Sequence, residues 1–304
     1  MNKSILIFGV SGFVGRYLSE EFYKNGYSVI GSDFKKSETV PEYVSFFECD
    51  ILNFGAVRDL IKRVNPTHII NLAAISNISV SWKEPQKTMA VNVNGTLNIL
   101  ESVKELLPSI RVLLVGSSEE YDVSDKPISE TEKLNANNPY GISKSVAEKF
   151  ADIYRQKFDM NIYCVRAFNH IGVGQSSSFV IPAWCKQAAI IDQEGTIFVG
   201  NLEVSRDFTD VRDVVRAYRM IIESGKDSVY NVGSGKVISL KEILSYIASL
   251  CEKSISIEVD ENLFRPSDNP VVCCDNQKIK NELGWEPKYD VFETIKEIYN
   301  SYLC

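Results

Sequence analysis

The stretch that decides the fold lies near the start of the chain, where residues 5–15 read Ile5-Leu-Ile-Phe-Gly9-Val-Ser-Gly12-Phe-Val-Gly15. A short apolar run leads directly into three glycines, and an amphipathic segment over residues 14–25 follows. This order predicts a buried strand, a tight turn and a helix. Glycine lets the backbone approach a pyrophosphate closely, and the helix N-terminus offers amide N–H groups to its charge. The stretch therefore predicts a dinucleotide-binding turn.

A carboxylate downstream of this turn points to the same ligand. Asp33 ends the second predicted strand and follows Gly15 by 18 residues. That spacing is close to the one expected for a carboxylate that holds an adenosine ribose. Because a carboxylate repels a 2′-phosphate, Asp33 favours NADH, whereas Lys35 and Lys36 beside it leave NADPH open. We therefore expect NAD(P)H as the cofactor.

The first half of the chain continues the alternation of strands and helices, which is typical of an α/β fold with a parallel sheet. The further strands are expected at residues 28–30, 68–72, 111–115 and 161–165, and the further helices at 54–64, 89–107 and 139–158. We predict a Rossmann-type, doubly wound NAD(P)-binding domain over residues 1–165. A smaller, partly interleaved substrate lobe follows over residues 166–304, with a segment near 205–235 returning to the core. Its helices are expected at 210–223, 239–251 and 291–302, and a strand at 229–233.

Composition excludes several classes of function. The 304 residues carry a net charge of −7, which argues against a nucleic-acid partner. No apolar run reaches the roughly 18 to 20 residues that a membrane span needs. Seven scattered cysteines predict reduced thiols in a cytoplasmic protein, and the two histidines lie in no metal-binding motif. We expect no metal site and no Ser-His-Asp triad.

The strongest chemical signal is Tyr140-Gly-Ile-Ser-Lys144, within the helix expected over residues 139–158. At this spacing both side chains lie on one face of the helix. An ammonium near a phenol stabilises the phenolate and lowers the pKa of the tyrosine. Such a tyrosine can give a proton to a carbonyl oxygen as hydride arrives, or remove one in the reverse direction. On an amphipathic helix the same spacing also occurs as a plain surface pair.

The glycine spacing is GxxGxxG, with Asp50-Ile51 after a third short run and Asn71-Leu72-Ala73-Ala74 after the next strand. This ordered series resembles the extended short-chain dehydrogenase/reductase family. The resemblance implies catalysis by Tyr140 and Lys144, with Ser117 polarising the reacting oxygen and Ser118 as its alternative. The cofactor-binding residues it implies are Gly9, Gly12, Phe13, Val14, Gly15, Asp33, Asp50, Ile51, Leu72, Ala73, Ala74, Tyr140 and Lys144.

The segment Arg166-Ala-Phe-Asn169-His170-Ile-Gly172-Val-Gly174-Gln175 resembles the corresponding run of GDP-6-deoxy-4-keto-mannose reductases, except that Ala167 and Val173 replace prolines. Arg206-Asp-Phe-Thr-Asp and Arg265-Pro-Ser-Asp268 resemble segments whose arginines clamp the diphosphate of a nucleotide sugar. The guanidinium fork suits phosphate oxygens. The substrate-binding residues implied are Ser117, Ser118, Glu119, Asn169, His170, Arg206, Arg265 and Asp268.

These resemblances predict NAD(P)H-dependent reduction of the C4 keto group of a GDP-linked 4-keto-6-deoxy sugar, of the GDP-4-keto-6-deoxymannose type. The alternative is a nucleotide-sugar 4,6-dehydratase or an epimerase, since dehydratases use a glutamate at the position of Glu119 to take a proton from C5. Glu119 is either such a base, a group that orients the substrate, or a remnant of shared ancestry. A non-catalytic, cofactor-sensing protein is a third alternative.

The resemblance also implies a homodimer that forms through the helices expected at residues 89–107 and 139–158. An amphipathic stripe on these helices would equally serve core packing. The base of the nucleotide, the length of the sugar and the stereochemistry at C4 stay open at this point.

Overall fold

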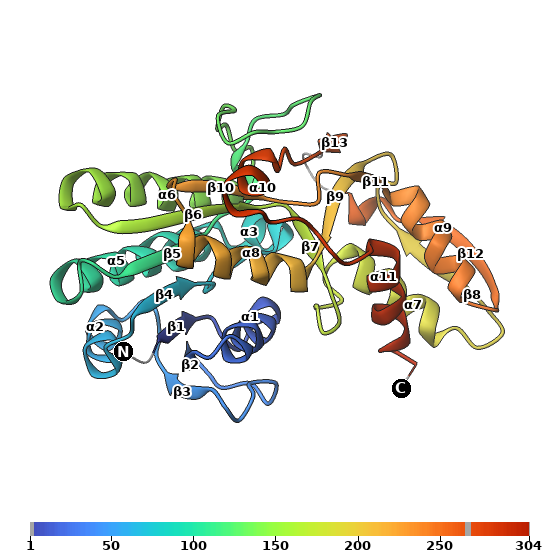
Figure 1. Ribbon diagram of the computed structural model, residues 1–304. Coiled ribbons are helices and arrows are strands. Elements are labelled where there is room, and N and C mark those ends of the chain that lie inside the picture. The colour runs from blue at the N-terminus through green and yellow to red at the C-terminus, as the bar shows by residue number, and fades with distance from the viewer. Residues whose placement is uncertain (1–2, 265–268, 304) are drawn as a thin grey trace.

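A seven-stranded parallel sheet forms the centre of the molecule, with strand order β10-β6-β5-β4-β1-β2-β3 (Figure 1). The computed structural model describes residues 3–264 and 269–303. The strands of this sheet are β1 (Ser4–Phe8), β2 (Ser28–Asp33), β3 (Ser45–Glu48), β4 (His68–Asn71), β5 (Arg111–Val115), β6 (Asn161–Ala167) and β10 (Val229–Val232). The predicted Rossmann-type fold class is confirmed.

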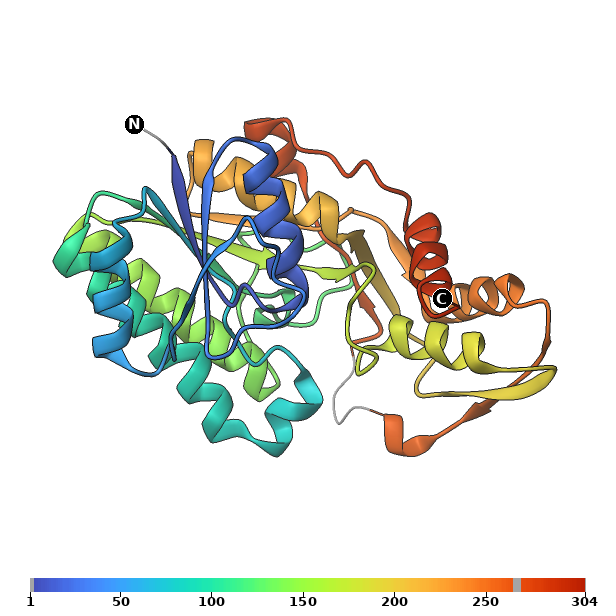
Figure 2. The same ribbon diagram turned by 90° about the horizontal axis from the view of Figure 1, so that it is seen from below.

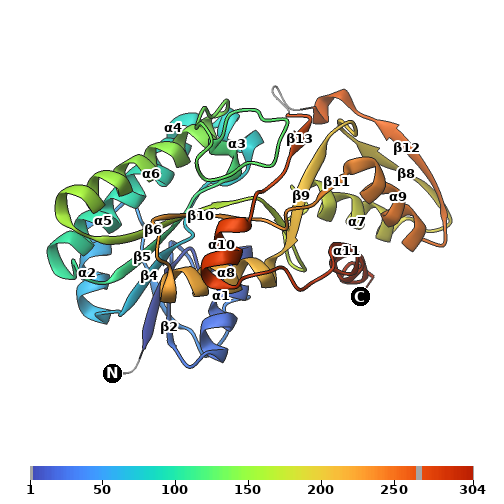
Figure 3. The ribbon, with the colours of Figure 1, turned by 45° about the horizontal axis from the view of Figure 1, so that its top comes forward.

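Helices cover both faces of this sheet because its strands carry apolar side chains on both sides. Ile5 and Ile7 of β1 pack with α1 (Phe13–Lys24) and α8 (Val211–Ser224). Leu6 and Phe8 point the other way and pack with the second helical layer. That layer consists of α2 (Phe54–Val64), α5 (Gly95–Leu106) and α6 (Pro139–Phe158) (Figure 3). The two cores hold the carboxyl ends of the strands in one row.

The long helix expected over residues 89–107 is interrupted in the structure. It runs as α4 (Pro85–Met89), a π-helical turn η1 (Ala90–Asn94) and then α5. Within the π turn, the buried Asn92 side chain accepts from the Ile75 N–H at 2.8 Å and donates to the Ser143 Oγ at 2.8 Å. Single π turns are often found at functional sites. Here the turn ties the loop after β4 to α6.

The remaining strands and helices form a second lobe beside the large sheet (Figure 2). The strands β7 (Asn169–Ile171), β11 (Val237–Ser239) and β13 (Val271–Val272) each pair with β9 (Ser205–Asp210), and β8 (Glu194–Val199) pairs with β12 (Ser254–Val259). Three helices share an apolar core with all of these strands except β13: α7 (Val180–Ile190), α9 (Leu240–Leu250) and α11 (Val291–Asn300). The chain returns to the large sheet through α8 and β10 between these elements.

Four short elements complete the described chain: α3 (Ile78–Lys83), η2 (Ser118–Glu120), η3 (Glu261–Leu263) and α10 (Gln277–Leu283). Within residues 3–264 and 269–303, no helix combines the length and apolarity needed to cross a membrane. The six cysteines in the same ranges are free thiols, and none of the acidic, histidine and cysteine side chains there form a cluster able to hold a metal ion.

Candidate functional site

A cavity of about 410 Å³ opens at the carboxyl ends of β1, β4, β5 and β6. Parallel α/β sheets bind their ligands at this edge. The walls come from both halves of the chain, so residues far apart in sequence meet here. The predicted site residues that line the cavity are Gly9, Gly12, Phe13, Val14, Gly15, Leu72, Ala74, Ser117, Ser118, Glu119, Tyr140, Lys144, Asn169 and His170.

The glycine-rich turn lies on one wall, and two of its positions exclude any side chain. Gly9 has a φ of +82°, and a Cβ there would lie 2.7 Å from the backbone nitrogen of Ala73. A Cβ at Gly15 would lie 2.4 Å from the carbonyl oxygen of Val10. Gly12 is the N-cap residue of α1, so the first amides of this helix lie at the cavity wall. The turn thus has the geometry that a pyrophosphate needs.

Four predicted cofactor residues do not line the cavity: Asp33, Asp50, Ile51 and Ala73. The Asp33 carboxylate accepts from the N–H groups of Ser11 at 3.2 Å and Phe34 at 2.8 Å, which ties the end of β2 to the glycine turn. Burial raises the pKa of Asp33 above its usual range. Asp33 therefore stands beside the turn, where the ribose of a dinucleotide would extend.

Of the other three residues, only Ala73 contacts the glycine turn. Asp50 Oδ1 accepts from the Leu52 N–H at 2.9 Å, in the bend that leads to α2. Ile51 packs on Gly95, where a Cβ would lie 2.9 Å from the isoleucine Cγ2. The Ala73 N–H donates to Asn71 Oδ1 at 3.0 Å, and its backbone touches Gly9.

Tyr140 and Lys144 lie in the first turns of α6, and both are buried. The helix starts at Pro139, and the Asn138 side chain caps it by accepting from the Gly141 N–H at 2.9 Å. Lys144 Nζ donates to the Val115 carbonyl oxygen at 2.6 Å, at the end of β5. The ammonium lies 5.9 Å from the centre of the Tyr140 ring. The cap by Asn138 therefore holds the start of the helix that carries this pair, and the bond to Val115 holds the end of the lysine side chain.

The ionisation of the pair differs from what its spacing alone suggests. Burial raises the pKa of Tyr140 above 10, and the negative charges of Glu120 and Glu119 add to this, while a hydrogen bond with Ser117 opposes it. Burial also lowers the pKa of Lys144 to about 8. The lysine was expected to lower the pKa of the tyrosine. In the structure burial raises this pKa instead, so the phenol stays protonated at neutral pH.

Ser117 ends the turn after β5 and opens η2 with a reciprocal capping box. Its Oγ accepts from the Glu119 N–H at 3.2 Å, and its own N–H donates to Glu120 Oε1 at 2.8 Å. Glu119 Oε2 accepts from Asn138 Nδ2 at 2.8 Å, so the cap of α6 also holds this carboxylate at the cavity. The spacing Ser-x-x-Glu is a capping-box signature, so this cap is visible in the sequence.

The opposite wall is formed by β7 and the loop that follows it. The His170 ring stacks on Phe13 of the glycine-rich turn, with centroids 6.3 Å apart and planes within 6°. Its Nδ1 lies 3.1 Å from the Phe168 carbonyl oxygen, and burial lowers its pKa, so the ring is neutral. The Tyr17 hydroxyl donates to the Val173 carbonyl oxygen at 2.8 Å. Contacts between α1 and this loop therefore join the two walls.

Several lining residues were not identified from the sequence: Ser76, Asn77, Ile78, Ser79, Gln175, Ser176, Ser178, Phe179 and Tyr218. Gln175 Nε2 donates to the His170 carbonyl oxygen at 3.0 Å. Gln175 Oε1 and the Tyr218 hydroxyl are buried and have no hydrogen-bond partner within the described chain. Most of these residues lie on loops or on a core helix, where no local pattern distinguishes a lining residue from its neighbours.

The predicted diphosphate clamp is only partly described. Arg206 is buried on β9 outside the cavity wall, and its Nη1 donates to the carbonyl oxygens of Asn269 at 2.6 Å and Ser205 at 2.9 Å. Arg265 and Asp268 lie outside the described residues. Asn269 directly follows that gap, so Arg206 lies next to one end of the segment that carries the second predicted arginine.

Comparison with known protein families shows to which family the chain belongs. A family model for GDP-mannose 4,6 dehydratase matches residues 6–298. The chain belongs to this family. The predicted resemblance to nucleotide-sugar enzymes of the extended short-chain dehydrogenase/reductase type is thereby confirmed.

Individual members of the family are similar over almost the whole chain. GDP-6-deoxy-D-mannose reductase of Pseudomonas aeruginosa is 28% identical, over 99% of this chain and 98% of the relative. GDP-mannose 4,6-dehydratase of Yersinia enterocolitica is 27% identical, over 97% of this chain and 92% of the relative. The solved structure of RMD from Pseudomonas aeruginosa, complexed with NADPH, matches with a TM-score of 0.85 at 27% identity, and 99% of each chain is covered.

Proposed function

We propose that the protein reduces the C4 keto group of a GDP-linked 4-keto-6-deoxy sugar, with NAD(P)H as the hydride donor. One observation carries this proposal. Ser117, Tyr140 and Lys144 line the same cavity as the glycine turn on one wall and Asn169 and His170 on the other. A dinucleotide and a sugar would therefore meet beside the three side chains that carbonyl reduction needs.

Each of these side chains has a defined task in the reduction. NAD(P)H supplies the hydride that reaches C4. The Tyr140 phenol, whose pKa is raised by burial, keeps its proton at neutral pH and gives it to the carbonyl oxygen. The Ser117 hydroxyl donates a hydrogen bond to the same oxygen as negative charge develops there. The Lys144 cation holds the nicotinamide ribose and stabilises the phenolate left on Tyr140.

The sugar nucleotide would occupy the second wall. Ser118, Glu119, Asn169 and His170 line the cavity and would face the sugar. Arg206 lies outside the cavity wall beside Asn269, so with Arg265 and Asp268 it would hold the diphosphate and ribose beyond that wall. The names of the relatives support a GDP-linked substrate, because the Pseudomonas aeruginosa protein is called a GDP-6-deoxy-D-mannose reductase. The division into a cofactor domain over residues 1–165 and a substrate lobe over residues 166–304 belongs to the same proposal.

NADH is the proposed form of the cofactor. The Asp33 carboxylate stands beside the glycine turn and would repel a 2′-phosphate. Lys36, one of the two lysines that left NADPH open, lies over the Phe46 ring at 5.9 Å. The remaining cofactor contacts are assigned to Gly9, Gly12, Phe13, Val14, Gly15, Leu72 and Ala74, with Asp50, Ile51 and Ala73 around them.

The test is a direct assay. The purified protein is incubated with GDP-4-keto-6-deoxymannose, oxidation of NADH and of NADPH is followed separately, and the product is identified by NMR. We expect stoichiometric oxidation, with the higher kcat/KM for NADH. Absence of turnover with either nucleotide would contradict the proposed reduction, and a higher kcat/KM for NADPH would contradict the role of Asp33.

A 4,6-dehydratase is the second candidate, because Glu119 lines the cavity and Asn138 holds its carboxylate in place. A dehydratase would convert GDP-mannose without added reductant, since it recycles its bound cofactor. GDP-mannose and NAD⁺ are therefore the second substrate set in the same assay. Formation of a 4-keto product would identify a dehydratase, and the proposed reductase would form none.

A homodimer and a cytoplasmic location complete the proposal. Ile142, Ile153 and Phe158 are apolar and exposed on α6, as a helix at a subunit interface would be. Light scattering after size-exclusion chromatography would measure the mass directly. We expect twice the mass of the chain, and Ile153→Asp should shift it toward the monomer.

A further inference from the structure

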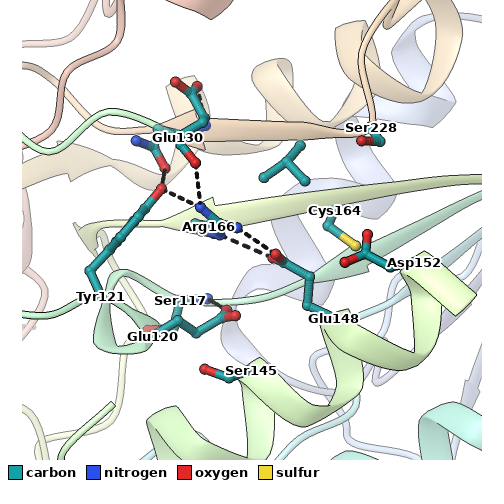
Figure 4. Close-up of polar contacts among 12 residues, drawn as sticks. Ser117, Glu120, Tyr121, Glu130, Ser145, Glu148, Asp152, Cys164, Arg166 and Ser228 are labelled. Atoms are coloured by element: carbon teal, nitrogen blue, oxygen red, sulfur yellow. Dashed lines mark hydrogen bonds and ion pairs between the residues drawn. The ribbon is translucent and has the colours of Figure 1, made fainter. Parts of the chain in front are cut away.

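The Glu120 carboxyl is buried beside Ser117, one of the three proposed catalytic residues (Figure 4). The residue closes η2 and has no exposed surface. Its Oε1 accepts from the Ser117 N–H at 2.8 Å, and its Oε2 has no hydrogen-bond partner in residues 3–264 and 269–303. A Cβ at Gly116 would lie 2.3 Å from Oε1, so the chain carries glycine where the carboxyl passes. The carboxyl is thus fixed beneath the Ser117 backbone.

The ionisable groups around Glu120 come from three elements. Tyr140, Lys144 and Glu148 face it from α6, Cys164 and Arg166 from β6, and Glu119 precedes it on η2. Arg166 is already neutralised, because its Nε and Nη2 donate to the two Glu148 oxygens at 3.1 Å and 2.5 Å. Its Nη1 donates to the Tyr121 hydroxyl at 2.8 Å (Figure 4). Both Arg166 and Lys144 act on Glu120 through their charge. Lys144 is the one that meets it at the same turn, because Lys144 Nζ bonds the Val115 carbonyl oxygen and Glu120 Oε1 bonds the Ser117 N–H two residues later.

We propose that Glu120 is a positioning residue for the reduction: it anchors the Ser117 backbone and, as a carboxylate, keeps Lys144 protonated into the alkaline range. Because Glu120 acts through Ser117 and Lys144, this role rests on the proposed function. Burial raises the pKa of Glu120 to about 8 and lowers that of Lys144 to about 8. The two groups titrate in one range, and a charge on either favours the charge on the other.

The decisive variant is Glu120→Gln. Glutamine keeps an oxygen for the Ser117 N–H and removes the charge beside Lys144. The lysine then loses its proton at lower pH, so the basic limb of the kcat/KM profile should move down by about one pH unit. The KM of the sugar should stay close to that of the unchanged protein. A limb that stays in place would overturn the proposal.

Glu148→Gln is the matched control. It also removes a buried carboxylate, but this one pairs with Arg166, whereas burial, Glu120 and Cys164 are what set the pKa of Lys144. We expect a lower Tm and a basic limb that does not move to lower pH. An equal downward shift in both variants would show a general effect of buried charge and would overturn the specific role of Glu120.

A spectroscopic readout separates this role from the proposed reaction. In protein with ¹³C-labelled lysine, the Cε shift of Lys144 reports its proton directly, and Lys144→Met assigns the signal. Its midpoint should fall in Glu120→Gln even if no keto sugar is turned over. If the Lys144 midpoint falls in Glu120→Gln but the unchanged protein turns over no keto sugar, only the proposed reductase is contradicted. If the protein turns over keto sugar but the midpoint does not fall, the role of Glu120 is contradicted.

Glu120→Asp keeps the test informative if the glutamine variant does not fold. The shorter side chain keeps the charge but withdraws from the Ser117 N–H. We expect a lower kcat with the Lys144 midpoint unchanged. A midpoint that falls although the carboxylate remains would overturn the proposal.

Discussion

The two walls of the cavity are built differently. The wall that we propose to bind the cofactor, the cofactor wall, consists of strand ends and first helical turns: the turn between β1 and α1, the end of β5 and the start of α6. The wall that we propose to bind the sugar, the sugar wall, consists of the three-residue strand β7 and the loop that follows it. The first is held by the main-chain hydrogen bonds and the two apolar cores of the large sheet. The second is held by the pairing of β7 with β9 and by Ile171 in the core of the second lobe, and its loop by single contacts such as those of Tyr17 and Gln175 with carbonyl oxygens.

This difference suggests that the residues for the reaction and the residues for substrate specificity lie on different walls. Groups that transfer hydride and proton must be placed to within a fraction of an ångström, and elements of a packed core provide that precision. A loop can change its residues without disturbing that core. Relatives named as reductases and as dehydratases share the family fold with this chain. We therefore expect changes in the cofactor wall to affect kcat or nucleotide binding, and changes in the sugar wall to affect the KM of the sugar.

The largest effect is expected for Tyr140→Phe, which removes the proton donor from the cofactor wall. General acid catalysis contributes about 10²- to 10⁴-fold, so kcat should fall by about that factor. Binding of GDP-sugar, measured by calorimetry, should be nearly unchanged. Tyr154→Phe is the control, since Tyr154 is buried on the same helix and its hydroxyl bonds Glu101 away from the cavity. Full activity of Tyr140→Phe would contradict the proposal that the proton donor lies on the cofactor wall.

The next effect concerns the turn itself. In Gly15→Ala the new Cβ would meet the Val10 carbonyl oxygen at 2.4 Å, so the backbone of the turn has to move. Overpacking of this kind costs about 1 to 3 kcal/mol. The Kd of NADH, measured by fluorescence quenching, should rise about 10- to 100-fold, because 1.4 kcal/mol corresponds to a factor of ten.

Gly55→Ala provides the comparison for this change. Gly55 lies in the first turn of α2, where a Cβ would be 3.5 Å from Asn53 Oδ1. Alanine is the better helix former, so the Tm should stay the same or rise slightly. Unchanged NADH binding in Gly15→Ala would show that the pyrophosphate does not lie on this turn.

The pH profile gives a smaller but distinct effect. Burial lowers the pKa of Lys144 from 10.5 to about 8, so its charge is present below pH 8 and is lost above it. If the cation stabilises the phenolate of Tyr140, kcat/KM should be constant near neutrality and then fall up to tenfold per pH unit above 8. In Lys144→Arg the side chain stays charged, and the remaining activity should no longer fall in that range. A fall that persists in the variant would come from another group.

Local patterns predicted the cofactor wall well. The helix bounds at 54–64 and 139–158 and the strand at 111–115 agree with the structure, because apolar periodicity and the helix-starting proline are local signals. The same holds for the glycines and for the spacing of Tyr140 and Lys144, which all line the cavity. These features depend on neighbours only a few residues apart.

The features that could not be predicted from the sequence depend on contacts between residues that are distant along the chain. The sign of the pKa shift of Tyr140 was wrong, since burial is a property of the folded core. The π turn at residues 90–94 arises where Asn92 reaches the loop after β4 and α6. Tyr218 belongs to a core helix, and its sequence neighbours do not distinguish it as a lining residue. The strands β8 and β12 are half polar and pair across about 60 residues of chain.

The smallest effect is expected where the two walls meet. The Tyr17 hydroxyl on α1 donates to the Val173 carbonyl oxygen at 2.8 Å, and Tyr17→Phe removes this one hydrogen bond. A single neutral hydrogen bond contributes about 1 kcal/mol, so the KM of the sugar should rise only about fivefold or less. Since the Phe13–His170 stack remains, kcat and the Kd of NADH should be unchanged. Tyr27→Phe, which loses a bond to Glu223 away from the cavity, should alter neither constant. A change in kcat rather than in KM would mean that the loop helps to place the reacting carbon, and the separation between the walls would then fail.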